Sequence, residues 1–416
     1  MYAWPPSPYL RKPSNKPRTL NRAVNTQATN ATARQLAPFA AMSASYFAHI
    51  GFFNPYLPLW LKDLGLSLIT ISLLITIQSI TRIVAPYGWG WLSDHTGERV
   101  KLMRYGATMA LIGSLGLWFN WGTWWFAFIL LIMFAHTSAM MPMSEAAMAH
   151  LVSSSGSFDA KRYGRVRLFG SVGFLVTVLA SGTWFEKYGM RDFPAWSTFT
   201  LLAVTIAVWL LPNHKEPRHA HEVNEPIWPI LQERKVQWFF ATLFFHVISH
   251  ISLYIFFSLY CDQLGYSKAT IGLLWAISIG VEIYWFFSQS RWLPALSLPA
   301  WLMVCSAVMV LRTGITATSA SVFALLVFAQ MLHAITFATH HTACIAMLSK
   351  HFPGRHRGRG QALYTVIGYG LTGFIGGVGG GFMSTKYGIS SVFYTSIATS
   401  LIALVCAYQV YKQHQT

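Results

Sequence analysis

The sequence predicts an all-α membrane protein with twelve transmembrane helices in two six-helix pseudo-symmetric halves. Its composition, the spacing of its apolar segments and an internal repeat support this prediction. Of 416 residues, 54% are hydrophobic and only 10% are charged, whereas a soluble globular chain carries about 25% charged residues. A water-soluble domain with so few charges would lack the polar surface to cover itself. The composition therefore excludes a soluble enzyme, a disordered protein and an ordinary nucleic-acid-binding protein.

Apolar segments of membrane-spanning length recur along the chain, and a span needs about 20 residues. We expect spans at 37–61, 68–92, 103–119, 122–147, 165–186, 193–211, 236–260, 268–290, 297–313, 320–349, 358–383 and 389–410. The long polar connection 212–235 is predicted to be a central cytoplasmic loop between an N-terminal half, 37–211, and a C-terminal half, 236–411. Residues 1–36 are polar, basic and proline-containing, so we expect a disordered cytoplasmic tail.

The basic residues predict the orientation. Lys and Arg number 30, and Asp and Glu only 13. If the N-terminus is cytoplasmic, 23 basic residues fall in cytoplasmic segments and five on the opposite side. Cytoplasmic loops are enriched in Lys and Arg, so we expect both termini in the cytoplasm, with the protein in a bacterial inner membrane. The orientation in the membrane then explains the excess of basic over acidic residues, and no nucleic-acid partner is expected.

An internal repeat relates the two halves. The segment LGLSLITISLLITIQSITRI (64–83) and the segment LGYSKATIGLLWAISIGVEI (264–283) share nine of twenty residues at an offset of 200. Loop Gly and Ser residues match as well as apolar ones, which argues against chance similarity. Both segments lead into an even-numbered helix, so the repeat is parallel, as in alternating-access transporters with a site between the halves. The offset also places Arg82 opposite Glu282.

The loop after the second predicted helix reads GWLSDHTGERVK. It resembles the G-x-x-x-D-x-x-G-x-R signature of the major facilitator superfamily, here carried by Gly90, Asp94, Gly97 and Arg99. The chain also resembles the phenylpropionate-permease group, which is related to lactose-permease-type proton symporters. The stretches that carry this resemblance are YGRVRLFGS at 163–171, GYSKATIGLLW from residue 265 and LHAITFATHH at 332–341. The resemblance covers about residues 40–410 and implies the fold of that superfamily.

Four charged residues lie deep in predicted spans: Arg82, Glu145, Glu282 and Arg312. An ionised side chain at the bilayer centre costs about 2.5–3.5 kcal/mol on insertion scales, so each is a candidate functional residue that faces a cavity or a partner.

The resemblance to lactose-permease-type symporters implies a proton-coupling group. In those proteins an acid on helix 8, an Arg on helix 9 and a His on helix 10 act together, and Glu282, Arg312 and His333 fall on these helices here. Glu282 would carry the proton, Arg312 would tune it and His333 would link it to the substrate. The helix-10 Glu one turn after the His is replaced by Thr336, which puts coupling through a second carboxyl in doubt. The alternative is a static Glu–Arg bridge between helices 8 and 9.

Two further groups of residues have open interpretations. Glu145 could pair with Arg82 or Arg167 at a binding site or gate, or form an ordinary interhelical bridge. Arg82 could instead hold an anionic substrate, because a planar guanidinium suits a carboxylate. His136, His246 and His250 are candidates for lining a substrate cavity or for ordinary packing.

No metal site and no disulfide are expected. His246 and His250 are four residues apart and share a helix face, but no acid or Cys accompanies them. The four cysteines show no paired spacing and are expected to be free thiols.

No nucleophile–base constellation or nucleotide-binding loop is present, so we do not expect an enzyme. The expected function is a proton-coupled symporter that imports a small organic molecule by alternating access, driven by the proton gradient without another cofactor. The resemblance favours an aromatic carboxylate such as 3-phenylpropionate. A sugar or nucleoside symporter, or proton-driven efflux of amphipathic compounds, is the alternative. The expected partners are the substrate, protons and the lipid bilayer, and we expect a monomer.

Overall fold

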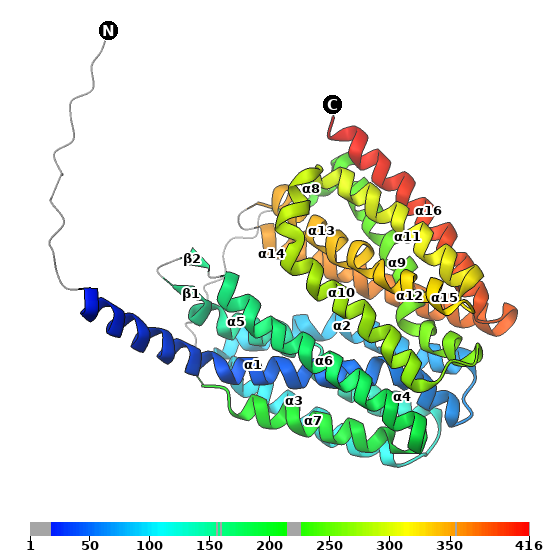
Figure 1. The fold of residues 1–416 in the computed structure, drawn as a ribbon, viewed down its shortest axis with the longest axis horizontal. Coiled ribbons are helices and arrows are strands. Elements are labelled where there is room, and N and C mark those ends of the chain that lie inside the picture. Colours follow the sequence, from blue (N-terminus) through cyan, green and yellow to red (C-terminus); the bar gives the residue numbers. More distant parts are fainter. Residues whose placement is uncertain (1–17, 155–156, 159, 214–225, 354–355, 416) are drawn as a thin grey trace, which may run out of the picture.

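A computed structural model describes all residues except 1–17, 155–156, 159, 214–225, 354–355 and 416, and it is almost entirely helical (Figure 1). The first half contains α1 (Arg18–Asp63), α2 (Leu68–Thr96), α3 (Arg99–Leu115) with the 3-10 turn η1 (Gly116–Trp118), α4 (Thr123–Thr137), α5 (Met140–Val152), α6 (Ala160–Tyr188), the 3-10 turn η2 (Met190–Asp192) and α7 (Phe193–Trp209). The second half contains α9 (Arg234–Gln263), α10 (Lys268–Trp292), the 3-10 turn η3 (Leu293–Ala295), α11 (Leu298–Ser319), α12 (Phe323–Met331), η4 (Ala334–Thr339), α13 (His340–His351), α14 (Arg357–Thr365), η6 (Val366–Leu371), α15 (Thr372–Tyr387) and α16 (Ser390–Gln413). The short helix α8 (Trp228–Gln232) lies between the halves in sequence, and β1 (Ser153–Ser154) pairs with β2 (Ser157–Phe158) between α5 and α6.

The predicted all-α membrane fold is confirmed. Eleven helices in the described part of the chain are long and apolar enough to cross a bilayer. The remaining predicted span, 103–119, falls on the shorter α3 and η1. In a membrane helix the backbone N–H and C=O groups bond to one another, so none of them is left unpaired in the apolar layer of the bilayer.

The helix α1 begins within the range predicted as a tail, 1–36. Residues 18–36 form the first turns of α1, while residues 1–17 lie outside the described part. Residues 18–37 contain neither Pro nor Gly, and they include the helix formers Ala, Leu, Gln and Arg. The prolines that suggested disorder all precede position 18.

Three long predicted spans are irregular inside. The span 122–147 is divided into α4 and α5 by a turn at Ser138 and Ala139. The segments η4 and η6, within the spans 320–349 and 358–383, are π-helical. A π-turn holds an extra residue per turn and is often found at functional sites. Apolar periodicity cannot reveal such local changes.

The internal repeat has a structural reason at the turn before α2 and α10. Gly65 and Gly265 adopt φ values of 82° and 86°, in the left-handed region where a side chain is strained. Ser67 Oγ then accepts a hydrogen bond from the backbone N–H of Thr70 at 3.3 Å, and Ser267 caps α10 in the same way. The repeated Gly and Ser therefore build the same helix start twice.

The halves meet along two pairs of helices, α2 with α15 and α6 with α10 (Figure 1). Along the first pair, glycines of α15 receive side chains of α2. A Cβ atom built on Gly377 would lie 2.0 Å from Thr76 Oγ1, and one built on Gly381 would lie 1.9 Å from Ser72 Oγ. These glycines allow the close approach that small-residue spacing permits between membrane helices.

Contacts between the halves are concentrated at one end of the bundle, which carries the turns 64–67 and 264–267 and is called the turn end below. There, Lys62 Nζ lies 2.8 Å from Asp262 Oδ2. The backbone N–H of Lys268 donates to Glu186 at 2.6 Å, and Tyr56 donates to the Lys268 carbonyl at 3.1 Å. These bonds join the two halves.

The opposite end carries the C-termini of α2, α10 and α16 and is called the termini end. Large apolar side chains are exposed there on α2 and α10. Tyr87 is 53% exposed and Phe287, its counterpart at the 200-residue offset, is 69% exposed. The described bonds that join the halves therefore lie at the turn end, which is called closed below, while apolar side chains of α2 and α10 are exposed toward the termini end.

Candidate functional site

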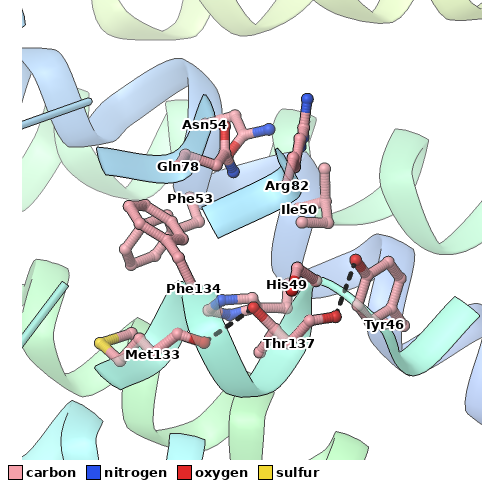
Figure 2. Close-up of a pocket in the computed structure, with 11 residues that line it drawn as sticks. Tyr46, His49, Ile50, Phe53, Asn54, Gln78, Arg82, Met133, Phe134 and Thr137 are labelled. Atoms are coloured by element: carbon pink, nitrogen blue, oxygen red, sulfur yellow. Dashed lines mark hydrogen bonds between the residues drawn. The ribbon is translucent and has the colours of Figure 1, made fainter. Parts of the chain in front are cut away.

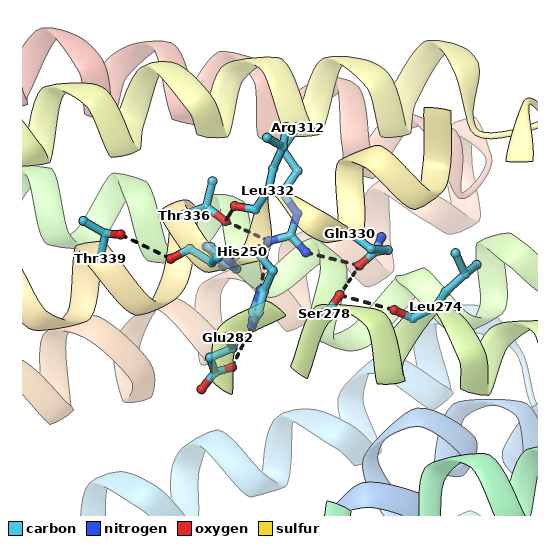
Figure 3. Close-up of polar contacts among 11 residues, drawn as sticks. His250, Leu274, Ser278, Glu282, Arg312, Gln330, Leu332, Thr336 and Thr339 are labelled. Atoms are coloured by element: carbon cyan, nitrogen blue, oxygen red, sulfur yellow. Dashed lines mark hydrogen bonds and ion pairs between the residues drawn. The ribbon is translucent and has the colours of Figure 1, made fainter. Parts of the chain in front are cut away.

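The predicted coupling residues of the second half lie together in the structure, and Figure 3 shows Glu282 and Arg312 among them. Glu282 comes from α10, Arg312 from α11, and His333 directly precedes η4. His333 Nε2 is 3.2 Å from Glu282 Oε2, and its Nδ1 is 3.1 Å from Arg312 Nη1. His333 thus bridges the acid and the base, and the described residues show no direct Glu282–Arg312 ion pair.

Arg312 determines the tautomers of two histidines. Its Nη1 is also 3.0 Å from Nε2 of His250, which comes from α9. A guanidinium can only donate hydrogen bonds, so the ring nitrogens facing it must accept. His333 therefore carries its proton on Nε2 and donates it to the Glu282 carboxylate, and His250 carries its proton on Nδ1.

The position where the symporter resemblance expects a second carboxyl also contacts Arg312. Thr336 Oγ1 also accepts from Arg312 Nη1 at 2.9 Å, so the two hydrogens of Nη1 are shared among three acceptors, and Gln330 Oε1 accepts from Nη2 at 3.3 Å. Gln330 Oε1 also accepts from Ser278 at 2.7 Å. Arg312 is only 2% exposed, and its described contacts are neutral oxygens and nitrogens. The charge is thus held by polar groups and not by a bonded carboxylate.

The first half contains a cavity of about 440 Å³, called the N-half cavity (Figure 2). Its lining residues come from α1, α2, α4 and the turn after α4: Tyr46, His49, Ile50, Phe53, Asn54, Gln78, Arg82, Met133, Phe134, Thr137 and Ser138. Gln78 donates to Asn54 Oδ1 at 3.3 Å. Arg82 has no hydrogen-bond or ion-pair partner among the described residues. The cavity therefore offers one unneutralised cation beside aromatic rings.

The other candidates of the first half lie apart from this cation. Glu145 Oε1 is 3.7 Å from Arg167 Nη1, with both side chains partly exposed. Of the two predicted partners, Arg167 is thus the one in contact. His136 Nδ1 donates to the Ile132 carbonyl at 2.7 Å and its ring packs against Trp89. His136 lines neither of the two cavities described in this section, in line with the packing alternative.

A second cavity, of about 230 Å³ and called the C-half cavity, lies beside the coupling group. It is lined by His246, Val247, His250, Tyr254, Thr336, Phe337, His340, His341 and Tyr369. Helix α2, which carries Arg82, packs against η6, which carries Tyr369, and α1 packs against α9. The two cavities are therefore lined by elements that are in contact across the boundary between the halves.

The loop motif has a local structural role. Gly97 ends α2 with φ 67°, and its N–H bonds to the Ser93 carbonyl. Arg99 Nε donates to Ser93 Oγ at 3.0 Å. Gly90 lies within α2, and the side chain of Asp94 is outside the described part. The motif thus fixes the turn into α3.

Several residues that line the two cavities or contact Arg312 were not among the predicted site residues: His49, Asn54, Gln78, Tyr254 and Tyr369 line the cavities, and Gln330 contacts Arg312. They carry no net charge, so a search for intramembrane charges passes over them. A search for amide side chains within apolar spans would have found Asn54, Gln78 and Gln330. Among the described residues there is no group of three or more His, Cys, Asp or Glu placed to hold a metal, and the four cysteines are free and buried.

Comparisons with known proteins agree with this architecture. The model of the MFS_1 like family matches residues 42–395. The chain is 24% identical over 362 residues to a probable 3-phenylpropionic acid transporter of Escherichia coli (strain K12), which covers 86% of this chain and 94% of that protein. It is 23% identical over 371 residues to a maltose permease of Geobacillus stearothermophilus, covering 86% and 90%.

Solved structures share the fold. A crystal structure of the nucleoside transporter NupG has a TM-score of 0.72 at 13% identity, covering 91% of this chain and 99% of that chain. A D-xylose-proton symporter has a TM-score of 0.68 at 13% identity, covering 91% and 97%. These proteins are transporters and not enzymes. The chain belongs to the MFS_1 like family, and it is an integral membrane transporter with the major facilitator fold.

Proposed function

We propose that this transporter is a proton-coupled symporter that imports a small aromatic carboxylate by alternating access. The observation that carries the proposal is the buried sequence of contacts from Glu282 through His333 to Arg312. A carboxylate 18% exposed can exchange a proton with a cavity.

The N-half cavity supports the substrate class. Arg82 offers an unpaired guanidinium for a carboxylate. Phe53 and Phe134 form an edge-to-face pair with centroids 5.9 Å apart, against which an aromatic ring can pack. The similarity to a probable 3-phenylpropionic acid transporter agrees with such a ligand.

Uptake into proteoliposomes tests the proposal. We expect a gradient that is acidic outside to drive accumulation of 3-phenylpropionate above equilibrium, and we expect a protonophore to abolish it. Maltose, xylose and a nucleoside are tested as further substrates in the same assay. Uptake of aromatic acids at the same rate with and without the proton gradient would exclude symport, and transport out of the proteoliposomes against a gradient would favour efflux.

A sugar or nucleoside symporter is the second candidate. Two similar proteins are a maltose permease and a nucleoside transporter. The amides of Asn54 and Gln78 in the N-half cavity could bind hydroxyl groups. Proton-driven maltose or nucleoside uptake without aromatic-acid uptake would favour this candidate.

We further propose that the protein acts as a monomer in the bacterial inner membrane, with both termini in the cytoplasm. The strong Lys and Arg bias toward one side supports this orientation. Both cavities are formed within one chain, so transport needs no second copy.

A further inference from the structure

The C-half cavity contains hydrogen-bonding groups that the proton-coupling group does not use. Its polar lining consists of histidines, tyrosines and Thr336, without an acid or a Lys or Arg. The π-helical segments η4 and η6 supply Thr336, Phe337 and Tyr369 to this lining. π-turns inside α-helices are frequent at functional sites, so this cavity is a candidate to bind an uncharged polar group.

The first unused group is an acceptor on His246. Its Nε2 is 2.7 Å from the Thr336 carbonyl oxygen. A carbonyl can only accept, so this nitrogen carries the proton and Nδ1 has a free lone pair in the neutral ring. His246 Nδ1 is buried without a hydrogen-bond partner in the described structure. The ring is fixed by stacking on His340, with centroids 3.7 Å apart.

The second unused group is a donor on His250. Because Arg312 donates to Nε2, the proton of His250 is on Nδ1. This Nδ1 has no partner among the described residues. The rings of His246 and His250 are one helical turn apart on α9, with centroids separated by 5.5 Å. An acceptor and a donor therefore lie side by side on one helix face.

We propose that this pair of histidines binds a hydroxyl group of the substrate. A hydroxyl donates one hydrogen bond and accepts others, so it can satisfy both rings. A carboxylate cannot donate to His246, and an ammonium cannot accept from His250 and would be repelled by the nearby Arg312. This inference rests on the proposed function and narrows its substrate class. With the carboxylate at Arg82 and the hydroxyl at His246 and His250, the substrate is a hydroxyaryl carboxylic acid.

A ligand panel on the wild-type protein tests this directly. 3-Phenylpropionate, its para-hydroxy derivative and its para-methoxy derivative compete for uptake of labelled 3-phenylpropionate into proteoliposomes. We expect the hydroxy acid to compete at a concentration about tenfold lower than the unsubstituted acid, as one added hydrogen-bonding group allows. The methoxy acid, which cannot donate, should show no such advantage.

A pair of variants assigns the effect to His246. His246→Phe keeps a flat ring against His340 but removes the acceptor, and it should abolish the advantage of the hydroxy acid. His136→Phe, the same change at a histidine that lines neither cavity, should retain that advantage. Thermal unfolding in detergent checks that both variants fold.

The outcomes separate this inference from the proposed function. If the three acids compete equally in the wild-type protein, water fills the position and the inference is wrong, while aromatic-acid symport stands. If none of the acids is transported or competes, both the proposed substrate and this inference are wrong. An advantage that persists in His246→Phe would place the hydroxyl elsewhere and would also overturn the inference.

Discussion

At the residue scale, the second-half network assigns different tasks to groups that a sequence search treats alike. Glu282 can gain and lose a proton, whereas Arg312 stays charged and accepts nothing. His333 lies between them and is held as a neutral ring while Arg312 donates to it. A proton on both nitrogens of His333 would require Arg312 to leave, so our proposal assigns the transported proton to Glu282 and not to His333.

The variant Glu282→Gln tests this assignment. Gln keeps the size of the side chain and can still bond to His333, but it cannot carry a proton. We expect loss of accumulation against a gradient with retained counterflow exchange, measured in proteoliposomes. Glu233→Gln, a matched change directly before α9 where the carboxylate pairs with Lys235, should retain accumulation. Accumulation by the Glu282 variant would show that another group carries the proton.

Arg82 is predicted to bind the substrate carboxylate. Lys keeps the charge but loses the planar, two-pronged donor arrangement of the guanidinium. For Arg82→Lys we expect the apparent KM for 3-phenylpropionate to rise about tenfold, which corresponds to the loss of one charge-assisted hydrogen bond. Arg104→Lys is the control, because Arg104 donates to the carbonyls of Trp209 and Leu211 at the end of α7. An unchanged KM for Arg82→Lys would exclude this role.

At the element scale, helices α2 and α15 can separate without breaking a hydrogen bond of the Thr76 or Ser72 hydroxyl. Thr76 Oγ1 donates to the Ser72 carbonyl at 2.7 Å, and Ser72 Oγ donates to the Ile69 carbonyl at 2.9 Å. Both hydroxyls are satisfied within α2, so moving α15 away leaves no buried donor unpaired. The contact depends instead on the close fit of α2 side chains on glycines.

Gly377→Ala and Gly379→Ala test this contact as a matched pair. Both raise helix propensity equally. A Cβ at Gly377 would lie 2.0 Å from Thr76 Oγ1, whereas one at Gly379 meets nothing within 4 Å. We expect Gly377→Ala alone to part the turn end. A cysteine introduced at Asn54 should then react severalfold faster with an impermeant maleimide added from that side, because the native cysteines are buried. An equal effect of both variants would contradict this expectation.

The elements also show which features a sequence can predict. Apolar length predicted the spans, because a membrane helix must bury about 20 residues. The break between α4 and α5 and the two π-segments were not predicted, since they depend on packing between helices. The contact of Arg312 with His250 could not be predicted either, because helical spacing does not specify which faces of α9 and α11 meet.

At the scale of the whole molecule, the two halves meet around a pseudo-two-fold axis. Lys62 and Asp262 are related by the same offset of 200 that relates the repeats, and they are in contact at 2.8 Å. Two equivalent positions can touch only close to the axis that relates them. The ion pair therefore marks the axis at the closed turn end.

Charge exchange tests the part that this pair plays in closure. Lys62→Asp places two carboxylates together and should shift the protein toward opening at the turn end. A partly exposed pair contributes roughly 0.2–1 kcal/mol, so the shift should be severalfold at most. The double variant Lys62→Asp with Asp262→Lys should restore only part of the wild-type labelling of a cysteine at Asn54, because Lys268 Nζ also lies 3.4 Å from Asp262 Oδ1 and would face the new lysine. Failure of the double variant to restore any of it would show that the pair does not hold this end closed.

The ion pair on the axis also bears on how the two halves came to form one chain. In a symmetric dimer of identical six-helix chains, the residue at this position would meet its own copy. Two lysines or two aspartates would repel each other there. Fusion of duplicated halves removes this restriction, because each copy can then change alone. Lys62 with Asp262, and Arg82 with Glu282, are positions where the joined copies differ in charge, and a dimer of identical chains could not carry such differences.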